Sequence, residues 1–342
     1  MDGAVFRAWV LRQWPVYFGA VVLSLLGFIG AFDHLPLIWL AAPLLISALI
    51  YGLPHGAIDD SILMKSMKRP GSAFWRWAIV WSAYLLVALL YLGVWVLSPS
   101  AAFVFFIILT WVHWGQGDLY FLKQVYRVSY LEHPIPKALA FFIRGGLPMG
   151  ITLIAFPETY QEVAGWTLAV FGSSEQSLDL FFGTNFINVI KYTLITIILT
   201  YALLILTLTK SSKKCDALVD ICEILVLSLF FLSLPPLFSI GIYFCVWHGL
   251  RHILRLWLWE TGKYASKSRF VFVPGSILLK TIPNTVLSLL FLVFIFYIPQ
   301  NQELRTEFII GVYLVLIACL TLPHFFTVCY MDWCEYRNKS LE

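Results

Sequence analysis

The sequence predicts an all-α, polytopic bundle of about ten transmembrane helices that occupies residues 1–342 as a single domain. Hydrophobic residues make up 60% of the chain and charged residues only 12%, whereas soluble domains carry roughly 25% charged residues. Because so little charge cannot cover a water-exposed surface, the composition excludes a soluble globular protein, a disordered chain and a nucleic-acid-binding protein. The lipid bilayer is the partner that this composition predicts.

Ten apolar segments have close to the ~20 residues that a helix needs to cross the hydrocarbon core of a membrane. In chain order they are 15–32, 37–58, 78–97, 101–122, 138–156, 186–209, 218–234, 239–259, 276–298 and 308–330. Between the fifth and the sixth segment, near 158–185, the short apolar piece 166–171 is expected to form a loop or a re-entrant segment.

Basic residues lie in alternate connections between these segments. Most of the 23 Lys and Arg residues fall before the first segment and after the second, fourth, sixth, eighth and tenth. The opposite connections carry mainly acidic residues, namely Asp33, Glu158, Glu162, Glu175, Asp179, Glu303 and Glu307. Cytoplasmic loops are the ones enriched in Lys and Arg. The pattern therefore predicts a multi-pass protein of the inner (plasma) membrane with both termini in the cytoplasm.

Histidines are the most informative polar residues of the apolar segments. His34 and His133 lie in predicted loops and are expected to be surface residues. The other five lie in the cytoplasmic halves of the second, fourth, eighth and tenth helices: His55, His113, His248, His252 and His324. Because polar side chains inside a membrane are costly and usually functional, five imidazoles at a similar depth are expected to form one cluster.

His248 and His252 are four residues apart. On a helix this spacing places both imidazoles on one face, as two ligands of one metal require. Gly249 leaves room beside the pair, whereas Arg251 and Arg255 are expected to project from another face toward lipid headgroups. The alternative is a histidine pair that only forms hydrogen bonds between helices.

His55 follows a proline and precedes an acidic residue at position i+4. Pro54 lacks an N–H and is expected to kink the helix near Ile50. The Asp59 carboxylate is then placed to accept a hydrogen bond from the His55 ring, an interaction that orients a ligating histidine. The alternative is an ordinary helix end with an exposed acidic pair.

The other two helices repeat these features. Asp118 lies five residues after His113 and is expected to orient its ring. His324 follows Pro323, so the kink argument made for His55 applies again. As a lone histidine, His324 is equally compatible with a metal ligand, a hydrogen-bond partner of a ligand and an ordinary core residue.

Several neutral imidazoles without thiolates favour iron, copper or zinc over magnesium or calcium. The chain has no recognisable nucleophile elbow, P-loop or dinucleotide-binding glycine motif at these positions. A redox metal in such an apolar, aromatic-rich environment indicates oxygen chemistry on an apolar substrate that enters from the lipid.

Four motifs in this order resemble successive signatures of a known family: 54–59, 113–118, 247–252 and 322–324. The family is Brp/Blh, whose members are membrane-integral bacterial and archaeal β-carotene 15,15′-dioxygenases found alongside microbial rhodopsins. The resemblance implies a non-haem Fe(II) cofactor with four histidine ligands, at His55, His113, His248 and His252. One departure is the pair Asp59-Asp60, where the first motif is expected to end in Asp-His.

The resemblance also implies the reaction, in which O2 cleaves the central 15,15′ double bond of β-carotene, or of a related carotenoid, to give two all-trans-retinal. The retinal product is then available to a microbial rhodopsin. Asp59 and Asp118 are the residues expected to orient the ligands. The aromatic residues expected to line a tunnel for the polyene, each with helix packing as its alternative role, are Trp111, Trp114, Tyr243, Phe244 and Trp247.

Three other functions are compatible with an intramembrane histidine cluster. A di-iron desaturase or hydroxylase needs around eight histidines in H-x3-H and H-x-x-H-H boxes, more than the five clustered here. A transporter would use the histidines and aspartates as a proton or metal pathway. A carotenoid-binding protein without catalytic activity would keep its pigment uncleaved.

Overall fold

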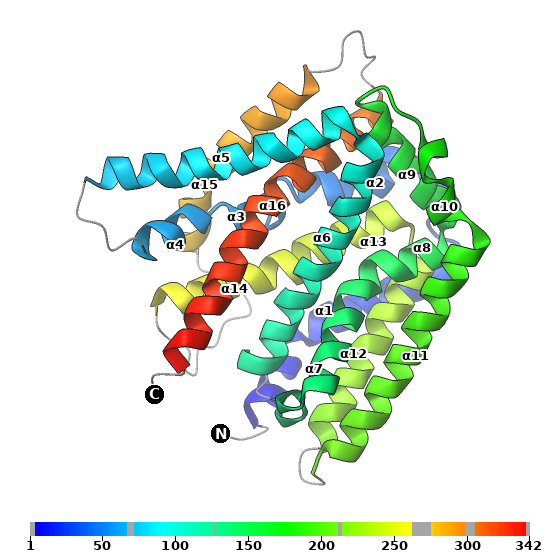
Figure 1. The fold of residues 1–342 in the computed structure, drawn as a ribbon. Coiled ribbons are helices and arrows are strands. Elements are labelled where there is room, and N and C mark those ends of the chain that lie inside the picture. The colour runs from blue at the N-terminus through cyan, green and yellow to red at the C-terminus, as the bar shows by residue number, and fades with distance from the viewer. Residues whose placement is uncertain are drawn as a thin grey trace.

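The computed structural model describes residues 4–66, 72–125, 128–210, 214–261, 275–297 and 305–339. Every regular element in these ranges is a helix, and they contain no strand. The helices pack into one bundle, in which α1 begins and α16 ends at the same end (Figure 1). The predicted all-α fold is therefore confirmed.

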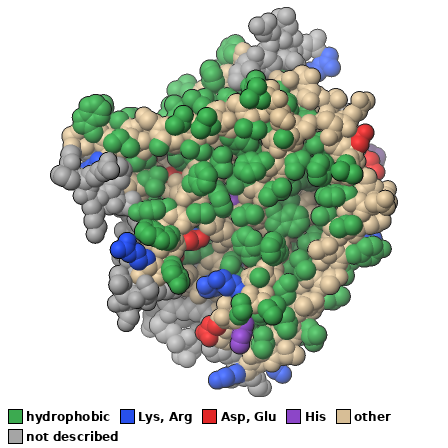
Figure 2. Space-filling model, in the orientation of Figure 1, with side chains coloured by type: hydrophobic (Ala, Val, Ile, Leu, Met, Phe, Trp, Pro, Cys, Tyr) green, Lys and Arg blue, Asp and Glu red, His purple; other side chains and the backbone are tan. Residues whose placement is uncertain are grey.

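Seven segments of the described chain are long and apolar enough to cross a membrane. They are Phe74–Leu97, Pro99–Gln124, Pro134–Ala155, Thr184–Leu208, Pro236–Leu256, Leu279–Phe296 and Thr306–Arg337. Two shorter apolar helices, Pro15–Phe28 and Leu37–Ile46, correspond to the first two predicted segments. On the face drawn in Figure 2, hydrophobic side chains cover most of the area and charged side chains lie mainly toward its lower part and rim. The chain is a membrane protein.

Six of the ten predicted segments correspond to long helices without an interruption among the described residues. These helices are α1 (Ala4–Phe28), α5 (Ala73–Leu97), α11 (Thr184–Leu208), α12 (Lys214–Ser233), α15 (Gly275–Phe296) and α16 (Thr306–Lys339). The fourth segment is α6 (Pro99–Tyr120), which continues into the π-helix η1 (Phe121–Val125).

The second predicted segment is broken rather than merely kinked. It forms α2 (Leu37–Ile46), a turn, α3 (Gly52–Gly56) and then α4 (Asp59–Ser66). In the turn Tyr51 has a φ of 57°, a left-handed conformation that residues other than glycine rarely adopt outside functional sites. Pro54 then falls in the first turn of α3, where its missing N–H disrupts no helical hydrogen bond. The interruption thus occurs at the expected place, near Ile50, and starts a new helix there.

Two further segments contain a π-helix at their centre. The fifth consists of α7 (Pro134–Gly146), η3 (Leu147–Ile151) and α8 (Thr152–Ala155). The eighth consists of α13 (Pro236–Ile242), η6 (Tyr243–Gly249) and α14 (Leu250–Thr261). π-Helical turns are rare and occur frequently at functional sites, and η6 contains the first histidine of the predicted pair.

Residues 158–185, which the sequence predicts to contain a loop or a re-entrant segment, are largely helical. They hold most of α9 (Pro157–Ala169), followed by the 3-10 helix η4 (Glu175–Leu178) and by α10 (Asp179–Phe182). The 3-10 helix η2 (Ser129–Glu132) lies earlier, between η1 and α7. α9 packs against α6 and α16, so this part of the chain contributes to the bundle.

Part of the predicted charge asymmetry falls on residues outside the described ranges. These residues are Lys68, Arg69, Arg127, Lys213, Lys263, Lys267, Arg269 and Glu303.

Within the described ranges, α6 and α7 approach closely because glycines face the opposite backbone. A Cβ on Gly115 would meet the carbonyl oxygen of Phe141, and one on Gly145 would meet that of Trp111. Small residues at such positions allow membrane helices to pack tightly.

Candidate metal centre

The five histidines of the apolar segments form one buried cluster, as the sequence predicts. His55 comes from α3, His113 from α6 and His324 from α16, while His248 and His252 come from η6 and α14. The ring centroid of His55 lies 5.1 Å from that of His248, 5.4 Å from that of His252 and 4.8 Å from that of His324. The ring of His113 lies 4.9 Å from that of His248 and 4.8 Å from that of His324. All five side chains are at most 6% exposed.

The ring nitrogens of this cluster suit a metal ion. The Nε2 atoms of His248, His252 and His324 are buried and have no hydrogen-bond partner among the described residues. Buried polar atoms are rarely left unpaired, and coordination of a metal is a physical reason for such a group. Ligand atoms of His55, His113 and His324 all lie within 4.8 Å of one another. The donor set therefore fits a metal that prefers imidazole.

The break before α3 orients His55. Its Nδ1 donates to the carbonyl oxygen of Tyr51 at 3.1 Å and also contacts that of Gly52. A hydrogen bond from Nδ1 to a backbone carbonyl fixes the tautomer in which Nε2 is the free ligand atom. The turn at Tyr51 thus takes the orienting role that the sequence assigns to Asp59.

Asp59 instead binds the last histidine of the cluster. Its carboxylate accepts a hydrogen bond from Nδ1 of His324 at 2.7 Å and another from the Tyr84 hydroxyl at 3.3 Å. The expected contact with His55 fails because α3 ends at Gly56 and the chain turns before Asp59, so the helical i,i+4 relation does not apply. Asp59 and His252 also form, with His324, a second group whose ligand atoms lie within 4.8 Å of one another.

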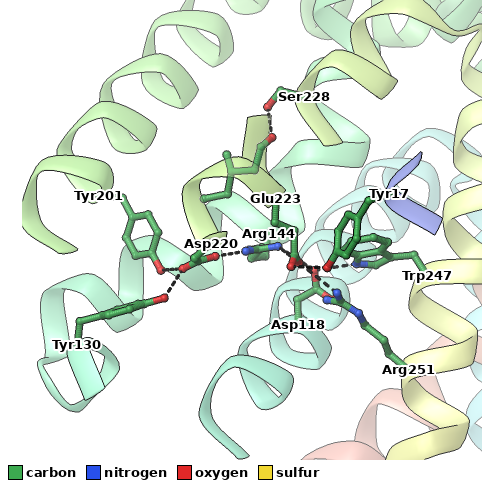
Figure 3. A network of polar contacts seen from close by, with 11 residues as sticks. Tyr17, Asp118, Tyr130, Arg144, Tyr201, Asp220, Glu223, Ser228, Trp247 and Arg251 are labelled. Carbon is green, nitrogen blue, oxygen red and sulfur yellow. Dashed lines mark hydrogen bonds and ion pairs between the residues drawn. The ribbon is translucent and has the colours of Figure 1, made fainter. Parts of the chain in front are cut away.

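Asp118 likewise does not bind the histidine for which it was predicted. Its carboxylate accepts hydrogen bonds from Arg251 at 3.0 Å and from Nε1 of Trp247 at 3.3 Å. Both donors flank His248 in the sequence. Asp118 therefore holds the segment that carries the histidine pair, and its contacts belong to a larger network of charges (Figure 3).

This network joins α6, α7, α12 and α14 inside the bundle. Arg144 forms ion pairs with Asp220 and Glu223, and Arg251 donates to Glu223 at 3.1 Å. Three tyrosine hydroxyls donate to the same two acids: Tyr130 to Asp220 at 2.7 Å, Tyr201 to Asp220 at 2.5 Å and Tyr17 to Glu223 at 2.9 Å. The ionic side chains are almost fully buried, so each charge depends on its partners.

The prediction for the two arginines of α14 is wrong. Arg251 is only 3% exposed and Arg255 only 1% exposed, so neither reaches lipid headgroups. Arg255 forms ion pairs with Asp332 and with Glu335, the latter at 3.6 Å. Acidic residues on neighbouring helices thus hold both arginines inside the protein.

Arg144, Asp220 and Glu223 are not among the site residues predicted from the sequence. Arg144 lies within the fifth apolar segment, and Asp220 and Glu223 lie within the seventh. The sequence feature that could have identified them is the series Asp216, Asp220 and Glu223 in α12. Acidic residues three and four positions apart inside an apolar helix require partners such as a buried arginine.

The five predicted aromatic residues divide into two groups. Phe244 and Trp114 pack on the cluster, with ring centroids 5.5 Å from His55 and 5.8 Å from His248, respectively. Tyr243 stacks on Trp247, which in turn lies under the Arg251 guanidinium. Trp111 points toward α7, where its Nε1 donates to the carbonyl oxygen of Phe142 at 2.9 Å. Phe244 and Trp114 line the cavities beside the histidines that are described next, whereas the linings of these two cavities do not include the other three aromatic residues.

Two cavities adjoin the histidine cluster. The outer cavity, of about 320 Å³, lies between α3, α5, α15 and α16 and includes the exposed side chains of Leu85, Leu287 and Leu290. The inner cavity, of about 80 Å³, lies between α6, α9, α13 and α16, and every residue that lines it is buried or half-buried. Asp60, the departure in the first motif, lines the outer cavity. An apolar substrate can therefore approach the cluster from the lipid side of α5 and α15.

The sequence as a whole matches a known family. Residues 46–332 match the family described as beta-carotene 15,15'-dioxygenase. A relative from Halobacterium salinarum, named probable beta-carotene 15,15'-dioxygenase Blh, is 35% identical over 302 residues, which cover 85% of this chain and 84% of the relative. No solved structure matches. The matched range contains all five clustered histidines, and the chain belongs to the beta-carotene 15,15'-dioxygenase family.

Proposed function

We propose that this protein is a membrane enzyme that cleaves the central 15,15′ double bond of β-carotene with O2 to give two all-trans-retinal. Its metal is Fe(II), held by His55, His113, His248 and His252. The observation that carries the proposal is the cluster of buried imidazoles beside an apolar cavity, in a chain of this family. Among the described residues, the groups of potential metal ligands contain no cysteine, and Asp59 is their only carboxylate.

When bound, non-haem Fe(II) supplies the one-electron chemistry with O2 that amino-acid side chains lack. The protein contributes binding, orientation and exclusion of water. The carbonyl oxygens of Tyr51 and Gly52 orient His55, and Asp118 holds the segment of His248 through Arg251 and Trp247. In the overall reaction the central C=C bond breaks, and each of its two carbons receives one atom of O2 as an aldehyde oxygen. Water is not consumed, so a dry, apolar site limits side reactions.

The two ring nitrogens of His324 have different surroundings in this site. Its Nδ1 donates to Asp59, and its Nε2 faces the cluster without a hydrogen-bond partner among the described residues. A carboxylate on one ring nitrogen is the usual support of a metal-binding histidine. We therefore include His324 as an additional candidate ligand, with Asp59 as the residue that orients it.

The substrate reaches this site from the membrane. β-Carotene is a rigid apolar polyene that partitions into lipid, and the outer cavity has exposed leucines of α5 and α15 at its margin. We place the enzyme in the inner (plasma) membrane, since its basic residues follow the positive-inside pattern. Retinal would leave by the same lipid route, where a microbial rhodopsin can take it up.

Expression in a carotene-accumulating bacterial host tests the proposal. The cells are expected to lose their orange colour, and retinal is expected in the pigment extract. The His248→Ala variant should abolish cleavage and iron retention, whereas His34→Ala, at an exposed loop position, should affect neither. Unchanged carotene in cells that contain folded, iron-loaded protein would refute the proposal, and two iron ions per chain would favour a di-iron oxygenase.

A further inference from the structure

The outer and inner cavities meet at the histidine cluster. Both are lined by His55, Phe244, Ile317 and Thr321. The outer cavity also borders His324 and Asp59, and the inner one borders His113 and His248. A long apolar molecule that enters between α5 and α15 can thus pass the histidines and continue into the interior of the bundle.

The depth of the inner cavity follows from the helices that line it. Phe103 precedes His113 by ten residues on α6, and Leu314 precedes His324 by ten on α16. With a helical rise of ~1.5 Å per residue, both pairs span about 15 Å. The inner cavity therefore extends about 15 Å beyond the level of the histidines.

Helix α9 covers the far part of the inner cavity. Tyr160 and Val163 line the cavity from this helix. A Cβ on Gly311, which precedes Leu314 on α16, would meet the carbonyl oxygen of Trp166, so α9 crosses α16 beyond the last lining residue of α16. Figure 1 shows α9 at the end of the bundle where α16 begins. The Tyr160 hydroxyl donates to the sulfur of Met149 at 3.4 Å, which ties α9 to η3 at this point.

This depth matches half of the proposed substrate. In an extended chain each bond advances about 1.2 Å, so the nine bonds from the central carbon of β-carotene to its end ring advance about 11 Å. The ring itself adds about 4 Å by the same covalent dimensions. One half of the molecule therefore has the length that separates the histidines from the end of the inner cavity.

We propose that the inner cavity receives one half of the carotenoid and that the Tyr160 ring, held by Met149, limits how far that half enters. The other half occupies the outer cavity. With the end ring stopped at Tyr160, the central double bond lies at the histidines, so Tyr160 and Val163 determine which bond is cleaved. The inference rests on the proposed function and adds the residues that determine its specificity.

Changing the depth of the inner cavity is expected to change the products. Removing the Tyr160 ring lets the carotenoid slide further in, so that a double bond beyond the centre reaches the histidines. Cleavage of that bond by one O2 still gives two carbonyl products with forty carbons in total, one longer than retinal and one shorter; a methyl-bearing carbon of the cleaved bond becomes a ketone and a CH carbon becomes an aldehyde. A bulky residue at Val163 fills the cavity and prevents the half-molecule from entering.

The test compares products by chromatography for wild type, Tyr160→Ala and Tyr160→Phe. We expect retinal alone from wild type and at least a tenth of the product of Tyr160→Ala as apocarotenoids of unequal length, aldehyde or ketone. Tyr160→Phe keeps the ring and should restore the symmetric product. If Tyr160→Ala cleaves carotene and still gives retinal alone, the inference is wrong.

Binding provides a readout that needs no cleavage. Metal-free protein, prepared with a chelator, is titrated with β-carotene, and its visible absorbance is followed. Val163→Trp is expected to weaken binding at least tenfold, whereas Ala169→Trp, at an exposed position of the same helix, is the matched control. Equal binding by both variants would overturn the inference and would leave the inner cavity as a passage for O2. If wild type binds but does not cleave, the proposed function fails while the binding comparison still decides the role of the inner cavity.

Discussion

The carboxylate of Asp59 accepts a hydrogen bond from Nδ1 of His324 at 2.7 Å, although the two residues are 265 positions apart. Only the turn after α3 allows this contact, because it directs Asp59 away from His55 and toward α16. The outer cavity reaches both side chains. A carboxyl acceptor on Nδ1 of His324 makes its other ring nitrogen a stronger ligand.

We expect Asp59→Ala to lower iron affinity roughly 10–100-fold, the usual effect of removing the partner of a ligating histidine. The measurement is the iron content that is retained during dialysis against a graded series of chelator concentrations. Asp179→Ala, at an exposed position, is the control and should retain iron as wild type does. An Asp59→Ala protein with normal iron retention would show that the hydrogen bond serves packing only.

The second prediction concerns His324 itself. If His324 is a ligand, His324→Ala should lose more iron than Asp59→Ala does, because the ligand atom itself disappears. The variant is compared with His252→Ala in the same dialysis, with His133→Ala as the control at an exposed loop position. Iron retention equal to that of Asp59→Ala would instead place His324 beside the metal and not on it.

The third prediction addresses the buried charges. Arg144→Met leaves Asp220 and Glu223 without the guanidinium that pairs with both. Breaking a buried ion pair by removing one partner destabilises a protein by about 3–5 kcal/mol. Thermal unfolding of the purified protein in detergent, followed by circular dichroism, should show a clear loss of stability.

The double variant Arg144→Met/Asp220→Asn serves as the internal control for this prediction. Removing the Asp220 charge, which Arg144 no longer compensates in that variant, lowers the energy of the buried site, so the double variant should be more stable than Arg144→Met alone. Additive destabilisation by the two changes would contradict the description of these residues as coupled charges.

The sequence predicts the histidine cluster because hydropathy and charge asymmetry place five imidazoles at one membrane depth. It does not predict their hydrogen-bond partners. The helical spacing assigned to His55 and Asp59 fails where the chain turns at Ala57, a break that depends on how α3 packs against η6. The pairing of Arg144 with Asp220 depends on the relative register of α7 and α12, which no local pattern encodes. Local periodicity therefore locates the ligands, and tertiary packing determines what supports them.

The last prediction concerns the contact between Gly249, which follows His248, and the turn that precedes His55. The sequence indicates that Gly249 leaves room beside His248, and the structure places the turn before His55 in that room. A Cβ on Gly249 would lie 2.5 Å from the carbonyl oxygen of Tyr51 and 2.9 Å from that of Phe244. Both acceptors are backbone atoms, so neither can rotate away.

Gly249→Ala is therefore expected to displace the turn at Tyr51 and with it the carbonyl oxygen that orients His55. We predict a loss of iron affinity of at least tenfold in the chelator dialysis, the size expected when the support of a ligand is disturbed. Gly93→Ala is the matched control, since a Cβ there meets no atom within 4 Å, and alanine at this helical site should stabilise by up to about 1 kcal/mol. Normal iron retention by Gly249→Ala would mean that the two backbone segments separate without moving His55, and that the turn at Tyr51 does not determine the geometry of the metal centre.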